Sequence, residues 1–241
     1  MTQQVVISQS MYFPWVGLLE QVRLADVFVH YDDVQFVRGF YNRVQIRTAV
    51  GTPWITVPLK DHHRGQRIDE IVVDDRVDWR QQHRDVLRQA YRKAPFRDEM
   101  LAVVDAVFSR QLITLAAVSR ASLLQLVDYF GLRGQRRFLD AKELAVGGAS
   151  SQRLLDITLA VGGNTYITGH GARNYLDHEL FERAGVSVRY MMYESVAYPQ
   201  LHGKFTPYVT GLDLIANRGK EGGSVIRSSA IDWRQFLSES T

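Results

Sequence analysis

The sequence predicts an α/β fold, built on a parallel Rossmann-like sheet with a small β insertion and a helical block. Three observations predict it. The chain opens with the pattern of a buried strand, a short helix and a second strand, which begins many parallel sheets. Strand and helix patterns alternate again after residue 131. Between them lie alternating polar and apolar residues and then helical patterns. We therefore predict one domain over residues 1–241, with the insertion at about 38–75 and the helical block at about 78–131.

The opening elements carry the first candidate site. Val5–Ile7 is a short apolar run of the buried-strand type, and apolar residues recur at helical spacing from Trp15 to Leu24. Asp26–His30 reads as the second strand. Ligands of parallel sheets bind beyond the carboxyl ends of the strands. The polar residues that follow these two strands are therefore candidates: Gln9, Ser10, Asp32 and Asp33.

The β insertion is predicted from three short segments. Arg43–Arg47 alternates polar and apolar residues, as a half-buried strand does. A turn signal at Val50–Pro53 precedes a second strand, Trp54–Leu59. We expect a third strand at Ile68–Val73. We expect the insertion to lie on the ligand side of the sheet.

The helical block and the last third of the chain follow. Asp78 is placed to cap a helix over Trp79–Tyr91, and Leu101–Phe108 and Leu112–Phe130 follow as further helices. No internal repeat or linker interrupts the chain. The expected later elements are a strand at Phe138–Leu139, a helix capped by Ser151 and ending at Ala160, a strand at Thr165–Thr168, a helix at Asp177–Ala184, a strand at Val186–Met192, a helix at Leu212–Ala216 and a loop at Gly219–Gly223.

Composition excludes several classes of protein. The chain has 241 residues, of which 46% are hydrophobic and 23% charged, as in ordinary globular proteins. It contains no cysteine, which rules out disulfides, thiolate metal sites and cysteine nucleophiles. No apolar run reaches the roughly 18 residues of a membrane helix. The first residues lack the pattern of a signal peptide, so we expect a cytoplasmic protein without a membrane partner.

The charge distribution predicts an anionic small-molecule ligand. The net charge of +3 is too balanced for a dedicated nucleic-acid binder, so no nucleic-acid partner is expected. From Arg38 to Arg97, however, 13 basic residues stand against 7 acidic ones. Such a basic segment favours a carboxylate or phosphate ligand. A solvated helix face is the alternative for Arg80, Arg84 and Arg88, which lie four residues apart. Oligomeric state is left open.

Two groups of residues at predicted strand ends are candidate catalytic groups. Asp32 and Asp33 are adjacent on an extended segment, so their side chains point in opposite directions and do not share a proton; loop capping is the alternative. Gly169 and His170 lie between a strand and a helix. His170 can move a proton near neutral pH, and Arg173 can hold an anion. A tight turn capped by the histidine is the alternative.

Further candidates lie on the insertion. Asn42, Arg43 and Lys60 form a polar, basic set, for which an exposed sheet face is the alternative. Tyr12 and Trp15 are close in sequence to the candidate site and suit either stacking on a ligand or the core.

Several familiar sites are absent from the sequence. There is no P-loop, no G-x-G-x-x-G dinucleotide fingerprint and no nucleophile elbow around Ser10. The neighbouring His62 and His63 lack the spacing of metal ligands, so no metal site is expected.

Several blocks of residues together carry a family pattern: Ser8–Gly17, Ala25–Val29, Asp32–Phe36, Asn42–Arg43, Trp54–Pro58, Tyr91–Phe96, Tyr166–Gly169, Tyr198–Gln200 and Leu212–Leu214. These blocks, which lie along nearly the whole chain, resemble the WbqC-like family. The resemblance suggests Gln35 and Tyr198, which lie in two of these blocks, as further substrate-binding candidates. It implies a bacterial biosynthetic role, associated with O-antigen clusters and with attachment of glycine to a sugar acid. The chain departs from the family pattern at Ser10 and Met11.

From the resemblance and the residues together, we predict an amide-forming acyl or amino-acid transferase or ligase acting on a sugar acid or a secondary-metabolite intermediate. Asp32 or Asp33 would hold the ammonium, His170 would accept its proton, and Arg43 with Arg173 would hold an anionic group. Fold-level analogy with pantothenate synthetase-like enzymes adds ATP with Mg²⁺ as a possible cofactor, although the H-x-G-H and K-M-S-K-S signatures are absent. The alternatives are a cofactor-free lyase or cyclase using His170 and Asp33, and a non-catalytic ligand-binding protein.

Overall fold

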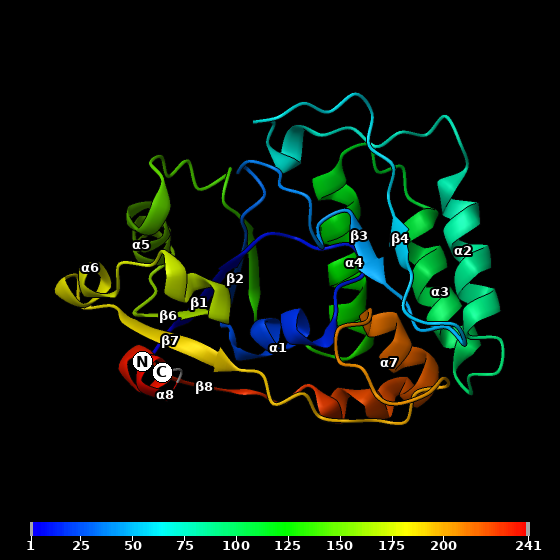
Figure 1. Cartoon of the computed structure of the whole chain (residues 1–241). Coiled ribbons are helices and arrows are strands. Elements are labelled where there is room, and N and C mark those ends of the chain that lie inside the picture. Colours follow the sequence, from blue (N-terminus) through cyan, green and yellow to red (C-terminus); the bar gives the residue numbers. More distant parts are fainter. Residues whose placement is uncertain (1, 240–241) are drawn as a thin grey trace.

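A computed structural model describes residues 2–239 and contains a six-stranded sheet in the order β5-β2-β1-β6-β7-β8 (Figure 1). The first five strands of that order run parallel, and β8 pairs antiparallel with β7. The parallel sheet predicted from the sequence is thus confirmed. Its strands are β1 (Gln4–Ser8), β2 (Val27–His30), β5 (Arg137–Asp140), β6 (Thr165–Thr168), β7 (Ser187–Met192) and β8 (Ser229–Asp232).

The strand order contains a topological switch point. From β1 the chain proceeds to β2 and β5 on one side, and then returns to β6, β7 and β8 on the other side. In the register, Val6 of β1 lies between Phe28 of β2 and Ile167 of β6. In doubly wound sheets the crevice beyond the strands at this point is the usual ligand site. Here that point is the carboxyl ends of β1 and β6.

Apolar residues on both faces explain why these strands are buried. Val6, Phe28 and Ile167 pack into the core cluster that contains α1 (Val16–Leu24). Val5, Val27 and Tyr166 pack on the opposite face, against residues of α5 (Ser150–Ala160) and α6 (His178–Arg183). Parallel strands covered on both faces read as continuous apolar runs, which is the pattern of Val5–Ile7.

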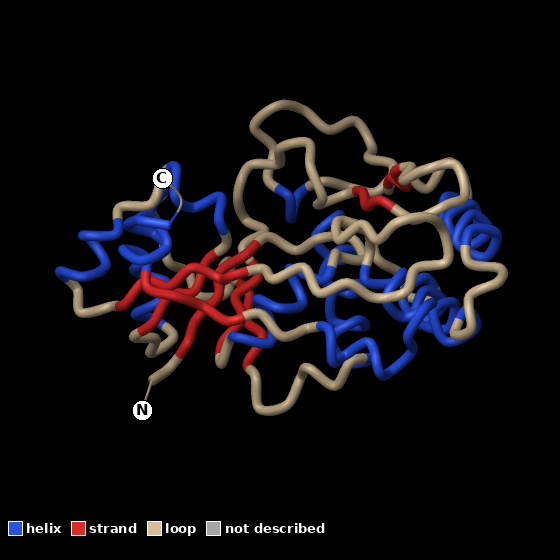
Figure 2. The backbone as a smooth tube through the Cα atoms, turned by 60° about the horizontal axis from the view of Figure 1, so that its bottom comes forward, coloured by secondary structure: helices blue, strands red, loops and turns tan. Residues whose placement is uncertain are grey.

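The insertion and the helical block lie at the carboxyl-end side of the sheet. Figure 2 shows the sheet in one half of the molecule and the hairpin with most helices in the other, and the arrow of β7 in Figure 1 points toward that second half. Asp78 caps α2 by accepting from the Gln81 backbone, as predicted. The elements of this half are β3 (Arg43–Gln45), β4 (Trp54–Thr56), α2 (Trp79–Ala90), α3 (Arg97–Phe108), α4 (Leu115–Tyr129) and α7 (Gly211–Arg218).

The predicted strand at Ile68–Val73 is wrong. Residues Ile68–Glu70 form the 3₁₀ helix η1, and the residues after it make only isolated β-bridges. Ile68 and Ile71 are both fully buried against Leu115 of α4. A spacing of three places both side chains on one side of a helical turn, whereas a strand would point them to opposite faces.

The predicted cap of α5 is also wrong. The helix begins at Ser150, and Ala149 occupies the cap position. Ser151 lies inside the first turn, where its hydroxyl accepts from the Asp177 backbone N–H at 2.9 Å. The hydroxyl therefore ties α5 to the start of α6 instead of capping its own helix.

The C-terminal part holds elements that the sequence did not suggest. The predicted glycine-rich loop lies within the 3₁₀ helix η3 (Gly219–Val225), and β8 and α8 (Trp233–Glu239) follow. Gly169 precedes a third 3₁₀ helix, η2 (His170–Asn174). Within residues 2–239, none of the helices combines the length and the apolar character needed to cross a membrane.

Candidate functional site

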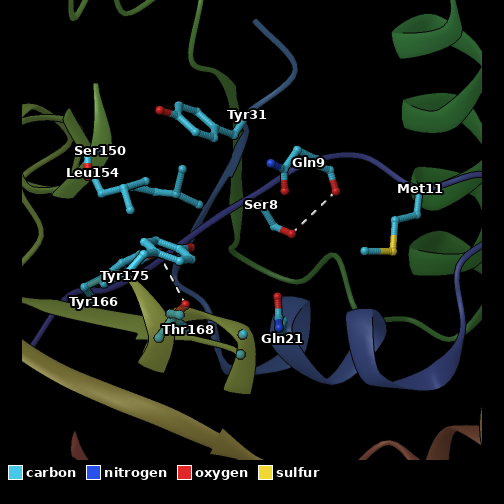
Figure 3. Close-up of a pocket in the computed structure, with 14 residues that line it drawn as sticks. Ser8, Gln9, Met11, Gln21, Tyr31, Ser150, Leu154, Tyr166, Thr168 and Tyr175 are labelled. Atoms are coloured by element: carbon cyan, nitrogen blue, oxygen red, sulfur yellow. Dashed lines mark hydrogen bonds between the residues drawn. The ribbon is translucent and has the colours of Figure 1, made fainter. Parts of the chain in front are cut away.

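A pocket of about 510 Å³ lies at the carboxyl ends of β1 and β6, which is the switch point of the sheet (Figure 3). We call it the switch-point pocket. Its volume is within the range of small-molecule sites. It is lined by Ile7, Ser8, Gln9, Met11, Gln21, Tyr31, Ser150, Leu154, Tyr166, Thr168, Gly169, Gly171, Ala172 and Tyr175.

The lining combines aromatic, amide and hydroxyl groups without a charged side chain among the described residues. In Figure 3, Tyr31, Tyr166 and Tyr175 lie on one side, and Gln9 and Gln21 lie on the other. Burial raises the pKa of the Tyr31 and Tyr166 hydroxyls, so both remain neutral hydrogen-bond donors at physiological pH. The pocket therefore suits a polar ligand that is held by hydrogen bonds and aromatic contact.

Gly169 allows the wall between β6 and α1 to close. A Cβ atom on Gly169 would lie 2.9 Å from Nε2 of Gln21, closer than side chains tolerate without moving. The absence of a side chain thus leaves room for the Gln21 amide at the pocket wall. The predicted role of the glycine, which is to leave room for a substrate, stays a prediction.

Asp32 is the centre of a buried network below the ends of three strands. Its carboxylate accepts from the Ser10 backbone N–H at 2.7 Å, from the Ser10 hydroxyl at 2.8 Å and from Arg120 of α4 at 2.5 Å. Burial raises the pKa of Asp32, and Arg120 and Ser10 oppose that shift. Arg120 also pairs with Asp140 at the end of β5. The network therefore fixes the ends of β1, β2 and β5 relative to α4.

His30 joins this network as a neutral imidazole. Its Nδ1 lies 2.9 Å from the Ser10 hydroxyl. Burial, aided by the charge of Arg120, lowers the pKa of His30 to about 4. Because the Ser10 hydroxyl is fully buried and engaged on both sides, Ser10 serves to connect the two strand ends.

Asp33 faces a different helix from Asp32. It forms a salt bridge with Arg153 of α5, whose guanidinium lies 4.9 Å from the ring centre of Tyr31 at the pocket wall. The predicted opposite orientation of the two carboxylates is confirmed. The second carboxylate oxygen of Asp33, Oδ1, is buried and has no hydrogen-bond partner within the part of the chain that the structure describes.

The structure places His170 and Arg173 on η2, outside the pocket lining. Nε2 of His170 donates to the Met191 carbonyl oxygen at 2.8 Å, and its ring lies 4.8 Å from that of Phe236. Their neighbours Gly169, Gly171 and Ala172 do line the pocket. A catalytic role for His170 stays a prediction, as does anion binding by the exposed Arg173.

Three predicted site residues lie in packed regions away from the pocket. The Tyr12 hydroxyl lies 2.9 Å from Nδ1 of His83, and the Tyr198 hydroxyl donates to Asp213 at 2.8 Å. Trp15 packs edge-on against Tyr193 with ring centres 4.8 Å apart. Each of the three side chains is therefore engaged by other side chains of the protein.

The remaining predicted residues lie on the insertion. Gln35 and Lys60 are exposed. Asn42 and Arg43 line a separate cavity of about 350 Å³, which we call the insertion cavity. The structure therefore brings Gln9 and Gly169 together, places Ser10, Asp32 and Asp33 beside them, and puts Arg43 in another cavity from the Gly169 turn.

Sequence reasoning missed most of the groups that shape the site. Gln21, Tyr31 and Tyr175 carry no pattern that separates them from ordinary surface residues. Arg120 did carry a signal, because it interrupts the otherwise apolar and small-residue run of α4. A charged residue in such a position needs a partner when buried.

The residues present do not complete an ATP–Mg²⁺ site. The tyrosines and amides of the switch-point pocket fit a nucleoside, but the described lining offers no cationic side chain for a triphosphate. Residues 2–239 contain no cluster of three or more histidine, aspartate and glutamate side chains placed to hold a metal ion.

The sheet order and the pocket define the class of protein: a doubly wound α/β protein with a pocket at the switch point. The chain belongs to the WbqC-like protein family, whose model matches residues 9–225. It is 30% identical over 229 residues to the uncharacterized protein Rv1507c of Mycobacterium tuberculosis, covering 93% of this chain and 98% of that protein. No solved structure matches the chain significantly.

Proposed function

We propose that the chain is a biosynthetic enzyme that joins an amine to an activated acyl group and binds the amine at the switch-point pocket. The observation that carries the proposal is the Asp33 carboxylate beside the pocket wall, with one oxygen paired to Arg153 and the other without a partner. A buried acceptor without a partner costs free energy, which an N–H donor from a ligand would recover. A primary ammonium supplies that donor together with a complementary charge.

The surrounding groups would bind the rest of the amine substrate. The hydroxyls of Tyr31 and Tyr175 and the amides of Gln9 and Gln21 offer donors and acceptors without adding net charge. Because Arg153 holds Asp33 on one side, the carboxylate is fixed in place before the substrate arrives. Such preorganisation is what makes proximity effective in catalysis.

The reaction balances as follows. In the proposed reaction, the ammonium loses one proton to Asp33 and becomes a nucleophilic amine. Its nitrogen attacks the acyl carbon, so that a C–N bond forms and the bond to the leaving group breaks. The second proton leaves the nitrogen with the leaving group, and the amide remains.

The test compares two buried, paired aspartates. Asp33→Asn removes the charge beside the pocket, whereas Asp69→Asn removes an equally buried charge whose two oxygens are both engaged by Arg67 and Lys142. Thermal-shift titration with glycine and a panel of other primary amines should show one that raises Tm. Asp33→Asn should weaken its binding at least tenfold, and Asp69→Asn should leave its Kd within about twofold.

The acyl-transfer step is tested on the same two variants. The amine identified by titration is incubated with thioester acyl donors, and the amide product is measured by mass spectrometry. Asp33→Asn should lower kcat/KM by roughly two orders of magnitude, the low end of acid–base contributions. Equal effects of the two variants, or no stabilising amine in the panel, would refute the proposal.

A further inference from the structure

The insertion cavity has the electrostatics of an anion site. It is lined by the cationic side chains Arg38 and Arg43, by His62 and by the amide of Asn42. Phe36 and the β4 segment complete its walls, and none of the described lining residues is acidic. A concave surface with one sign of charge attracts ligands of the opposite sign.

Arg43 is held in place by stacking but has no anionic partner. Its guanidinium lies 4.3 Å from the ring centre of Trp54 across the β3–β4 hairpin. Its Nε is buried without an acceptor, and the described chain places no carboxylate in a salt bridge with it. By contrast, Arg67 and Arg76 of the same insertion pair with Asp69 and Asp74. The orientation of Arg43 is thus fixed while its hydrogen bonds remain available.

The Asn42 side chain holds a second atom without a hydrogen-bond partner, and this atom is an acceptor, whereas Nε of Arg43 is a donor. The residue is 7% exposed, and its Nδ2 donates to the Val57 carbonyl oxygen at 3.2 Å. That bond fixes the orientation of the amide, which leaves Oδ1 as a buried acceptor without a donor in residues 2–239. A ligand that satisfies both Asn42 and Arg43 must accept one hydrogen bond and donate another.

We propose that the insertion cavity is a second ligand site, which takes an oxyanion that carries its own hydroxyl donor. Two groups have this chemistry, a protonated phosphate and a hydroxycarboxylate. The anionic oxygen accepts from Arg43, and the O–H donates to Asn42. This inference rests on the proposed function and deepens it, because it identifies the group by which the acyl substrate is held.

Tyr41 packs beside the insertion cavity. Its ring centre lies 6.4 Å from that of Phe36 in the insertion cavity. Burial raises the pKa of Tyr41, and the nearby hydroxyl of Tyr175 and the charge of Asp32 raise it further. In this proposal, a substrate anchored on Arg43 extends from the insertion cavity toward the switch-point pocket.

The experiment uses four small anions in two matched pairs on the whole chain. Phosphate carries an O–H at neutral pH and sulfate does not; glycolate carries a hydroxyl and acetate does not. Calorimetric titration should give a Kd at least fivefold lower for phosphate than for sulfate, or for glycolate than for acetate. The pair that discriminates identifies the source of the oxyanion.

Variants locate the binding. Arg43→Gln should raise the Kd of the bound anion at least tenfold, and Arg43→Lys, which keeps the charge but lacks Nε, should raise it severalfold. Arg64→Gln removes an exposed charge from the same insertion outside the cavity and should leave the Kd unchanged. Binding should alter Trp54 fluorescence, and Trp54→Phe should abolish that change.

Two results would overturn the inference: equal affinity within both pairs of anions, or binding unaffected by Arg43→Gln. In the second case Tyr175→Ala is titrated as well, to see whether it abolishes the binding. Loss of binding in Tyr175→Ala would put the anion in the switch-point pocket and leave the amine-binding proposal intact. Conversely, failure of the amine titration with normal anion binding at Arg43 would refute the proposed function alone.

Discussion

Replacing Arg120 should lower the free energy of unfolding, because Arg120 neutralises the buried carboxylate of Asp32 at the edge of the sheet. Asp32 is fully buried, whereas the Arg120 side chain is 22% exposed. Breaking a buried ion pair by deleting one partner costs about 3–5 kcal/mol, because the remaining charge is left without compensation. Two hydrogen bonds from Ser10 would still serve Asp32, so we expect Arg120→Met to cost about 3 kcal/mol, at the lower end of that range.

The assay is thermal and urea unfolding followed by circular dichroism at neutral pH. For a chain of this length, about 3 kcal/mol corresponds to a fall in Tm of about 6–12 °C. Arg88→Met is the matched control, because the Arg88–Asp85 pair is exposed by 54% and 45%. Exposed pairs contribute at most about 1 kcal/mol, so the control should lose no more than about 4 °C.

A double variant separates the charge from the packing. In Arg120→Met with Asp32→Asn the buried charge is gone, while the side chain of residue 32 can still accept from Ser10. We expect the double variant to be at least about 1 kcal/mol more stable than Arg120→Met alone, as coupled neighbours are not additive. The reasoning is refuted if Arg120→Met costs no more than Arg88→Met, or if the second change brings no recovery.

Two further predictions concern buried groups. Burial raises the pKa of Glu20 from 4.5 to about 7, so the folded state binds the extra proton and wild-type stability falls as pH rises through this window. Relative to wild type, Glu20→Gln should therefore gain up to about 3 kcal/mol between pH 4.5 and 8, which urea unfolding at both pH values measures; a constant difference would contradict it. Tyr198→Phe removes a donor to buried Asp213 and should cost about 1–2 kcal/mol in urea unfolding. The Kd of Tyr198→Phe for the anion, measured by calorimetry, should be unchanged. A higher Kd would mean that Tyr198 binds the substrate.

The sequence was informative where one local rule decided the structure. Continuous apolar runs identified β1 and β2, and the rule that ligands bind beyond the strand ends brought Gln9 and Gly169 to one pocket. The apolar run that begins at Ile68 predicted a strand, and this prediction was wrong. Ile68 and Ile71 lie three residues apart and are both buried, which is the pattern of a helical turn.

The candidate site was only partly predictable for a physical reason. Gln21, Tyr31 and Tyr175 meet at the pocket because β1, β2 and β6 are adjacent, and no spacing along the chain encodes that adjacency. The same holds for Arg153, which reaches Asp33 from a helix more than a hundred residues away. Arg43 was recognised as an anion-binding candidate, but its separation from the Gly169 turn became visible only in the fold.

The central claim is that the switch-point pocket binds the amine substrate, and two exposed tyrosines test it most directly. Tyr175 is 59% exposed and lines the pocket, and Tyr208 is 54% exposed and lies outside the pocket lining. The measurement is the calorimetric Kd of the stabilising amine for Tyr175→Ala and Tyr208→Ala. We predict that Tyr175→Ala raises the Kd at least fivefold at unchanged Tm while Tyr208→Ala leaves the Kd unaltered. An identical Kd in both variants and in the wild type would contradict the claim.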